Sequence, residues 1–281
     1  CMIVYRTKSD LSGHLHSLQS EGLTIGLVPT MGALHRGHTS LVEKAAAEND
    51  VVVVSIFVNP TQFNDPSDLE QYPRTLDADL ELLRKLETDL VFVPSVNEMY
   101  PDEDRQIFDL GGLDKVMEGE HREGHFNGVA QIVSKLFLVV SPTRAYFGQK
   151  DFQQLVIIRR LVEILGLNMT IVPCPIIREK DGLAMSSRNT RLSREERKLA
   201  PFIYDTLVQA RDRMETLSPA QVKEWVRFQF DNQPSLRLEY FEIVEDKGLT
   251  PINDWDEKVN KVACLAVHLG DVRLIDNLNF A

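Results

Sequence analysis

Short apolar runs alternate along the chain with longer stretches in which apolar residues recur every three or four positions. Residues 24–29 and 51–58 are rich in valine and isoleucine and too short for a full helix, whereas residues 38–49 between them have helical spacing. Near-continuous apolar strands joined by a helix are typical of a parallel sheet that is covered on both faces. This stretch therefore predicts a strand–helix–strand unit.

The same alternation continues through the first two thirds of the chain. The pattern predicts helices over residues 76–87, 129–139 and 153–165, and strands over residues 89–94, 145–147 and 168–173. We therefore predict a Rossmann-like, doubly wound parallel sheet in an α/β domain of residues 1–176.

The pattern changes after residue 177. Ser193 with Glu196, and Ser218 with Gln221, have the spacing of capping boxes, which predicts helices over residues 194–214 and 219–230. Segments 236–244, 259–268 and 272–275 then predict strands. We expect residues 177–281 to form a smaller α+β domain. The polar segment 178–189, which contains Gly182, is a candidate hinge and moving cover.

The charge of the chain argues against a nucleic-acid partner. Its 281 residues include 31 Lys and Arg and 42 Asp and Glu, which gives a formal net charge of −11. Non-specific binding to nucleic acids needs a basic surface. The longest apolar stretches, residues 51–58 and 136–140, are too short to span a bilayer, and no charged-then-apolar leader opens the chain. We expect a cytoplasmic protein without a membrane partner.

The cysteines predict neither a disulfide framework nor a thiolate zinc site. There are three, Cys1, Cys174 and Cys264, and no two of them form a Cys-x-x-Cys pair. An odd number of widely separated cysteines fits a reducing compartment.

The first candidate functional residues follow the apolar run of residues 24–29. His35 and His38 lie three residues apart, where the next helix is predicted to begin. Open α/β sheets bind ligands at the carboxyl ends of their strands, and the free N–H groups of a helix N-terminus favour anions. Gly32 and Gly37 allow the backbone to approach a ligand closely. This context favours a nucleotide site over a turn with two exposed histidines.

Two histidine pairs also have spacings that zinc ligands use. They are His35 with His38 and His121 with His125. The second pair lacks a glutamate directly after its first histidine, and Gly124 weakens a helix there. We therefore expect no protein-bound zinc, and His125 is interpreted as either a cleft residue or a buried histidine.

A second group of candidate residues lies just past the predicted sheet domain. Met185 is followed by Ser186, Ser187 and Arg188. Two hydroxyls and a guanidinium suit a phosphate chain, although such a loop is commonplace by itself. The sequence contains no Walker A motif and no Gly-x-Gly-x-x-Gly after a strand, which excludes the P-loop and dinucleotide-binding classes.

Together these segments resemble a known enzyme family. The turn of residues 29–38 and the loop of residues 185–188 are similar to the two signatures of the HIGH nucleotidyltransferase superfamily. Six collinear segments resemble the pantothenate synthetases, or pantoate–β-alanine ligases: residues 29–38 (PTMGALHRGH), 55–63 (SIFVNPTQF), 72–75 (YPRT), 124–129 (GHFNGV), 146–155 (YFGQKDFQQL) and 181–189 (DGLAMSSRN).

The resemblance implies a two-step ligation. Magnesium-bound ATP and (R)-pantoate give pantoyl adenylate and pyrophosphate, and β-alanine then displaces AMP to form pantothenate. It also implies a homodimer. The implied catalytic residues are His38, His35, Lys150 and Arg188, with His38 as a candidate proton donor to the phosphates. The implied ATP site consists of Pro29, Thr30, Met31, Gly32, Ala33, Leu34, His35, Arg36, Gly37, His38, Gly148, Gln149, Lys150, Asp151, Ile177, Met185, Ser186, Ser187 and Arg188.

The resemblance assigns the substrate side to neutral and apolar residues. Gln62 and Gln154 are expected to bind pantoate together with Met31 and Phe57, and Gln62 is also expected to meet β-alanine. An amide offers two donors and an acceptor, which suits a substrate with hydroxyls and a carboxylate. The resemblance also makes Asp79 a candidate magnesium ligand.

Two alternatives remain open. One is another adenylyl transferase of the superfamily, acting on a phosphopantetheine or a nicotinate nucleotide, but the glutamines favour a small carboxylate over a phosphorylated acceptor. The other is a non-catalytic nucleotide sensor. Such a sensor is expected to lose His38, Lys150 or Arg188, and all three are present.

Overall fold

The apolar runs of the first two thirds of the chain form a single six-stranded parallel sheet. The computed structural model describes residues 2–280 and orders the strands β1-β4-β3-β2-β5-β6. Their bounds are β1 (Ile3–Tyr5), β2 (Ile25–Thr30), β3 (Val51–Ile56), β4 (Leu90–Phe92), β5 (Arg144–Gly148) and β6 (Thr170–Cys174). Every paired neighbour in this sheet is parallel, which confirms the predicted Rossmann-like arrangement.

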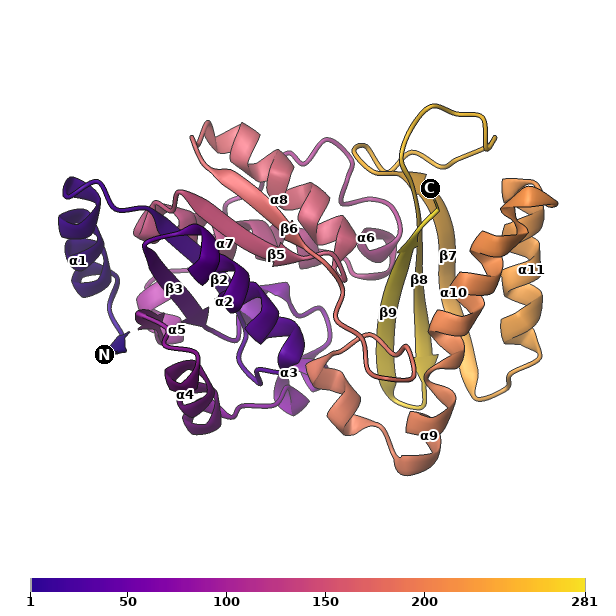
Figure 1. Ribbon diagram of the computed structural model, residues 1–281, viewed down its shortest axis with the longest axis horizontal. Coiled ribbons are helices and arrows are strands. Elements are labelled where there is room, and N and C mark those ends of the chain that lie inside the picture. Colours follow the sequence, from indigo (N-terminus) through magenta and orange to yellow (C-terminus); the bar gives the residue numbers. More distant parts are fainter. Residues whose placement is uncertain (1, 281) are drawn as a thin grey trace.

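Helices cover both faces of this sheet (Figure 1). In β3, Val51 and Val53 point to the layer of α1 (Lys8–Ser20), α7 (His125–Val140) and α8 (Phe152–Leu165). The alternate residues Val52 and Val54 point to the layer of α2 (Arg36–Glu48) and α4 (Leu76–Lys85). Successive side chains of a strand point to opposite faces, so two buried faces explain why these strands are apolar throughout.

The strand order places a crevice beside β2. This strand pairs with β3 on one side and with β5 on the other, so the chain connections leave its carboxyl end in opposite directions. Open α/β sheets bind ligands at such a switch point. The segments that follow β2 and β5 contain His35 and Lys150, respectively.

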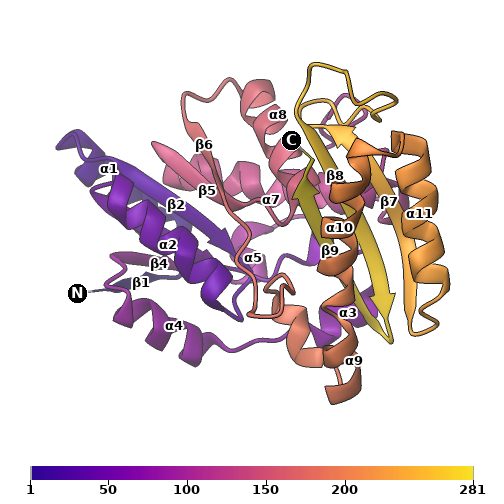
Figure 2. The same cartoon turned by 45° about the vertical axis from the view of Figure 1, so that its right-hand side comes forward.

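The last third of the chain forms a smaller unit around an antiparallel sheet. Its strands are β7 (Leu236–Glu245), β8 (Lys261–Leu269) and β9 (Val272–Asn279), in the order β7-β8-β9. Figure 2 shows the helices α10 (Phe202–Asp212) and α11 (Pro219–Asp231) against one face of this sheet. The predicted α+β character of this unit is confirmed.

The predicted single helix over residues 194–214 is wrong. The chain forms α9 (Arg194–Leu199) and α10, followed by the short 3₁₀ helix η3 (Arg213–Glu215). Pro201 lies between α9 and α10, and proline cannot donate the backbone hydrogen bond that a continuous helix needs at that position. The capping box of Ser193 with Glu196 forms as predicted.

Several elements go beyond the sequence prediction. The helix predicted over residues 129–139 begins four residues earlier, at His125. The strand β1 and the helix α1 precede the first predicted strand. Short helical turns occur in the connections: η1 (Pro60–Gln62), α3 (Pro66–Gln71), α5 (Val96–Met99), α6 (Glu118–His121) and η2 (Ser187–Arg191). Within residues 2–280, no helix is long and apolar enough to cross a bilayer.

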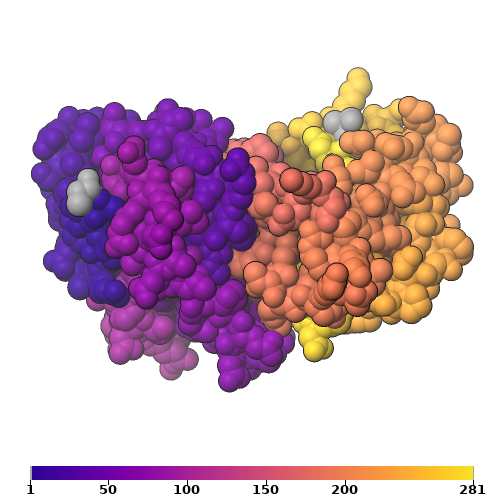
Figure 3. Space-filling model, turned by 60° about the horizontal axis from the view of Figure 1, so that its bottom comes forward, coloured from indigo at the N-terminus to yellow at the C-terminus, as the bar shows by residue number. Residues whose placement is uncertain are grey.

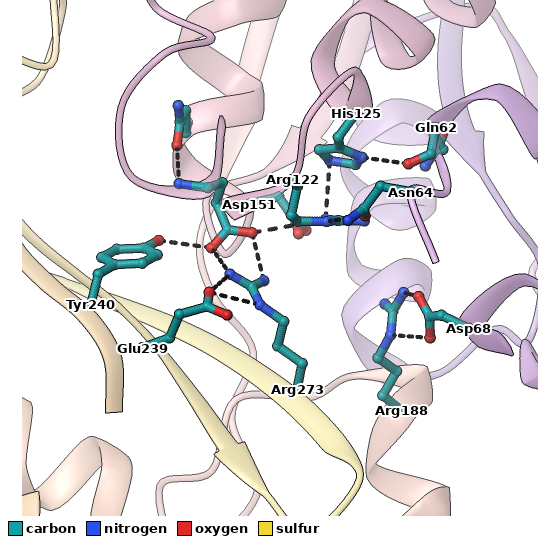
Figure 4. A network of polar contacts seen from close by, with 12 residues as sticks. Gln62, Asn64, Asp68, Arg122, His125, Asp151, Arg188, Glu239, Tyr240 and Arg273 are labelled. Atoms are coloured by element: carbon teal, nitrogen blue, oxygen red, sulfur yellow. Dashed lines mark hydrogen bonds and ion pairs between the residues drawn. The ribbon is translucent and has the colours of Figure 1, made fainter. Parts of the chain in front are cut away.

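The two units lie side by side along a broad boundary (Figure 3). Part of their contact is a small apolar cluster and a buried ion-pair network. Val262 and Cys264 of β8 pack against Met117 and Val156 of the larger unit. Beside them, Arg273 of β9 bonds to Glu118 at 2.7 and 2.9 Å. Figure 4 shows Arg273 facing Glu239 and Tyr240.

Candidate active site

A cavity of about 230 Å³ lies at the switch point between the carboxyl ends of β2 and β5. It brings together residues from the β2–α2 turn, the end of β3, the helix α7, the start of α8 and the segment after β6. The predicted site residues that line it are Pro29, Thr30, Met31, His35, Gly37, His38, Phe57, Gln62, Gly148, Lys150, Asp151, Gln154, Ile177, Met185, Ser186, Ser187 and Arg188.

Six predicted site residues do not line this cavity: Gly32, Ala33, Leu34, Arg36, Gln149 and Asp79. Asp79 is buried beneath the β2–α2 turn. Its carboxylate accepts hydrogen bonds from the backbone N–H groups of Ala33 (2.9 Å) and Leu34 (2.8 Å), and from the Thr75 hydroxyl (3.2 Å). Asp79 therefore holds the turn, and its expected magnesium-side role stays a prediction.

The two glycines of the turn are required by its own packing. Gly32 has a φ of +79°, and a Cβ there would lie 3.0 Å from the Asp79 carboxylate. A Cβ on Gly37 would lie 2.8 Å from the His35 ring. Only glycine lets the turn close over Asp79 and lets the His35 ring fold back over the first turn of α2.

A reciprocal capping arrangement fixes both histidines of the turn. The backbone N–H of His35 donates to Nδ1 of His38 at 3.3 Å, and the backbone N–H of Gly37 donates to Nδ1 of His35 at 3.1 Å. A backbone N–H can only donate, so each Nδ1 is an unprotonated acceptor, and in the neutral imidazole the proton is on Nε2. Both rings therefore have an Nε2–H that remains available as a donor.

The expectation that free backbone N–H groups of α2 face the ligand is corrected by the same arrangement. The N–H groups of His38 and Thr39 bond to the His35 carbonyl oxygen at 2.8 and 3.1 Å, in addition to the two capping bonds of His35 and Gly37. The first turn thus satisfies most of its own donors. The imidazoles, rather than the backbone, are left to contact an anion.

Burial keeps both imidazoles neutral. It lowers the pKa of His38 to about 3, and the neighbouring His35 and Lys150 act in the same direction. It also lowers the pKa of His35 to about 4, again with help from Lys150. In the ligand-free protein at neutral pH, His38 consequently offers a hydrogen-bond donor, and its expected proton donation to the phosphates stays a prediction.

The position of the Lys150 backbone is fixed by β9 of the smaller unit as well as by the segment that follows β5. The Asn277 side-chain amide donates to the backbone carbonyls of Gln149 and Lys150, both at 2.9 Å. The Lys150 ammonium lies 3.7 Å from the Asp151 carboxylate. Lys150 thus reaches the cavity from the carboxyl end of β5, and the C-terminal strand fixes its backbone.

The segment of the second signature crosses from the smaller unit to the larger one. The Ser187 hydroxyl donates to the Ala33 carbonyl at 3.1 Å, and Ser186 accepts from the Arg188 N–H at 3.2 Å as the cap of η2. Figure 4 shows Arg188 turned toward Asp68 of α3. This segment therefore packs against the β2–α2 turn and closes the cavity there.

A hydrogen-bonded chain orients the Gln62 amide. The buried Asn59 donates to Gln62 Oε1 at 3.1 Å and accepts from the Tyr100 hydroxyl at 2.8 Å. With its oxygen engaged, Gln62 directs Nε2 toward the cavity, 3.2 Å from the Met31 sulfur. Gly128 of α7 packs directly on this loop, because a Cβ there would lie 2.7 Å from the Gln62 Cα.

His125 is both a cavity residue and a buried histidine, which unites the two sequence interpretations. Its Nδ1 lies 2.7 Å from the Gln62 carbonyl oxygen and its Nε2 lies 3.1 Å from the Arg122 guanidinium. Because the carbonyl can only accept, Nδ1 carries the proton and Nε2 accepts from Arg122. Burial, followed by the charge of Arg122, lowers the pKa of His125 to about 3.

One wall of the cavity is apolar. The helix α7 contributes Val129, Ile132, Val133 and Leu136, and these side chains face the cavity together with Phe57 and Met31. Lys150, Arg188 and the two histidines also line the cavity. The lining therefore combines a cationic, donor-rich wall of these four residues with the apolar wall, and it also includes Gln62 and Gln154.

The comparisons with known proteins agree with this geometry. Residues 3–279 match the family model described as pantoate-beta-alanine ligase. The chain belongs to the pantoate–β-alanine ligase family. It is 56% identical to the pantothenate synthetase of Phocaeicola vulgatus over 280 residues, and 53% identical to that of Porphyromonas gingivalis over 279 residues, with 99% of each chain covered in both cases.

Solved structures of pantoate–β-alanine ligases have the same fold. The pantothenate synthetase from Thermus thermophilus superposes with a TM-score of 0.90 at 42% identity, covering 99% of both chains. The pantoate-beta-alanine ligase from Francisella tularensis, complexed with beta-gamma ATP and beta-alanine, superposes with a TM-score of 0.83 at 38% identity. That match covers 100% of this chain and 98% of the other.

Within this ligase, the segment expected to be a hinge is firmly attached to the smaller unit. Arg178 donates to both Asp276 oxygens at 2.6 and 2.9 Å and stacks on the Tyr204 ring at 3.8 Å. Gly182 has a φ of +91°, and a Cβ there would clash with that ring. Gly182 therefore serves a tight turn packed on Tyr204, and its expected role as a point of bending stays a prediction.

The residues fit a magnesium ion that arrives with its nucleotide. Among residues 2–280, no group of three or more histidine, cysteine, aspartate or glutamate side chains could hold a metal ion. Asp151 is the carboxylate that lines the cavity next to Lys150. Magnesium is commonly bound by one or two carboxylates, water and substrate phosphates rather than by a protein cage.

Proposed function

We propose that this ligase, which condenses pantoate with β-alanine using ATP, does so through pantoyl adenylate formed from (R)-pantoate. The observation that carries the proposal is one cavity lined by His35, His38, Lys150 and Arg188, by an apolar wall and by two glutamines. The donor-rich wall suits a triphosphate. The apolar wall with its amides suits a small carboxylate that has hydroxyls and a dimethyl group.

In the first step, a pantoate carboxylate oxygen attacks the α-phosphorus of ATP. The new O–P bond forms as the bond between the α-phosphorus and the bridging oxygen breaks, and pyrophosphate leaves with the electron pair. Negative charge grows on the departing phosphates, so catalysis rests on positioning and on prearranged donors. The Nε2–H groups of His35 and His38, with the Lys150 and Arg188 cations, provide that stabilisation.

In the second step, the β-alanine amine attacks the acyl carbon and AMP leaves. We propose that Gln62 presents its Nε2–H group to the pantoyl moiety and to β-alanine, since Asn59 occupies its oxygen. Gln154 contacts pantoate from α8. The walls formed by α7 and by the Ser186–Arg188 segment limit the access of water to the acyl adenylate, which would otherwise hydrolyse.

Magnesium, when bound with ATP, neutralises part of the phosphate charge. In our proposal Asp151 is the protein carboxylate closest to this ion, and Asp79 holds the turn beneath. Residues 1–176 form the ATP- and pantoate-binding domain, and residues 177–281 form the domain that covers it. The contact of Ser187 with Ala33 supports this division of labour.

We further propose a homodimer located in the cytoplasm. Leu138 is 66% exposed on α7 and Ile107 is 85% exposed. Leu138 is on the same helix as Gln131, whose amide donates to the carbonyls of Asp104 and Gln106, and Ile107 directly follows Gln106. A second copy is the proposed cover of these exposed apolar side chains, and light scattering should give twice the chain mass.

Cys174 and Cys264 are free thiols, which fits a reducing compartment.

The experiment that tests the reaction is an end-point assay with ATP, pantoate and β-alanine, each omitted in turn. AMP, pyrophosphate and pantothenate are expected in equal amounts when all three are present. Formation of ADP and inorganic phosphate instead, or product without pantoate, would contradict the proposal.

A further inference from the structure

Asp68 forms an ion pair with the guanidinium of Arg188. Its carboxylate accepts from Arg188 Nη2 at 2.6 Å and from Nε at 3.3 Å. The same carboxylate accepts from Arg191 at 3.0 Å. Partial burial raises the pKa of Asp68, but the bonds and charges of the two arginines outweigh it and hold the pKa below its usual range. One carboxylate thus pairs with two guanidinium groups.

Arg188 lies between two cavities. It lines the candidate active site, and it also lines a neighbouring polar cavity of about 530 Å³, to which Asp68 and Arg191 belong as well. Asp68 lies only on the polar side. The pair therefore forms the boundary between the active site and the polar cavity, with Asp68 on the side away from the bound substrates.

The ion pair conflicts with the role of Arg188 toward phosphate. A phosphate on Arg188 would lie next to the Asp68 carboxylate, and like charges at such short distances repel by about 1 kcal/mol in water and by more at a half-buried site. Asp68 is on α3, a helix of six residues without a buried side chain. The Asp68 contact is therefore less costly to release than a contact from the sheet.

We propose that Asp68 is an exchangeable counter-ion of Arg188, which yields to the phosphates of ATP and returns to the guanidinium as pyrophosphate leaves. The proposal rests on the proposed function, because it takes Arg188 as a ligand of the β- and γ-phosphates. Asp68 is a positioning residue in this account. It limits the affinity of the site for pyrophosphate and so favours release of this product into the polar cavity.

The test compares the wild-type enzyme with Asp68→Asn and Glu70→Gln. Both variants lose one negative charge from α3, but Glu70 is exposed and its side chain does not bond to Arg188. Calorimetry with magnesium pyrophosphate, and separately with a magnesium-bound ATP analogue methylene-bridged between the α- and β-phosphates, gives the dissociation constants. Asp68→Asn should bind pyrophosphate about fivefold more tightly, with a smaller gain at high salt. Glu70→Gln should bind as wild type does.

Product inhibition gives an independent readout. Pyrophosphate should inhibit Asp68→Asn at lower concentrations than wild type, whereas Asp68→Glu should restore the wild-type inhibition constant. If Asp68→Asn misfolds, Asp68→Ala serves as the second variant with the same expectation. Unchanged or weaker pyrophosphate binding by a folded variant would overturn the proposal. Failure of the wild-type enzyme to bind the ATP analogue at all would instead contradict the proposed function, and this inference with it.

Discussion

The backbone N–H of His35 donates to Nδ1 of His38, so the two histidines of the turn are linked through the first turn of α2. This contact fixes the tautomer of His38, and the burial of the imidazole keeps it neutral. The site thus holds a neutral, oriented donor, and in our proposal it lies where charge develops on the phosphates, which is the arrangement that prearranged stabilisation requires.

The first prediction concerns pH. Nuclear magnetic resonance of the ligand-free enzyme should show His38 neutral down to about pH 4, since its pKa is lowered to about 3. Below the ordinary histidine pKa of about 6.5, His38 binds a proton in the unfolded chain but not in the folded chain. The free energy of unfolding therefore decreases as the pH is lowered. His38 should cost about 2 kcal/mol of unfolding free energy at pH 5 relative to pH 7.

Urea denaturation of the wild type and of His38→Gln at the two pH values checks this effect. The variant should lose less stability on acidification, because it lacks one histidine that is protonated only in the unfolded chain. A His38 resonance that titrates near pH 6.5 would show that the imidazole is neither buried nor held by the His35 N–H.

The second prediction concerns the phosphate contacts. His38→Ala and Lys150→Ala should each lower turnover by a factor on the order of 10² to 10³, as the loss of one prearranged stabiliser does. The matched controls are His16→Ala and Lys85→Ala, because both residues are exposed and far from the cavity lining. Turnover within about threefold of wild type in a folded His38→Ala or Lys150→Ala variant would remove that residue from the phosphate site.

The third prediction separates the substrate wall from the nucleotide wall. Gln62→Ala should raise the KM values for pantoate and β-alanine, since a hydrogen bond to a neutral group contributes about 0.5–1.5 kcal/mol. The affinity for a non-hydrolysable ATP analogue should stay near that of wild type. A large loss of nucleotide affinity would place Gln62 in the ATP site instead.

The fourth prediction distinguishes Asp79 as a support of the turn from Asp79 as a metal ligand. Asp79→Asn replaces an acceptor of two backbone N–H groups, so the melting temperature should fall even without nucleotide or metal, and Asp77→Asn should not change it. Chelation of magnesium should abolish turnover but leave the melting temperature of the ligand-free enzyme unchanged. A melting temperature that falls on chelation would require a metal held by the protein itself.

The sequence predicts the central strands and the nucleotide turn because both follow from local patterns. Consecutive valines in residues 51–54 indicate a strand buried on both faces, and a glycine-rich turn between strand and helix indicates a ligand site. The break at Pro201 is equally readable, since proline removes a helical donor, and the capping box alone predicts too long a helix.

Other site residues have no local signal. Asn277 reaches the Lys150 backbone across 127 positions, and Asp68 reaches Arg188 across 120. Such pairs depend on how β9 and the Ser186–Arg188 segment dock against the larger unit, and hydrophobic periodicity gives no information about that docking. The role of Asp79 is similar, because an aspartate in the first turn of a helix is ordinarily exposed, and only the fold shows the turn above it.

The central claim is that the enzyme activates pantoate by transfer of adenylate rather than of phosphate. The most direct measurement follows oxygen-18 from the pantoate carboxylate through one turnover with β-alanine. Attack on the α-phosphorus should leave one labelled oxygen in AMP, with unlabelled pyrophosphate as the other nucleotide-derived product. Recovery of the label in inorganic phosphate, with ADP as the nucleotide product, would contradict the account.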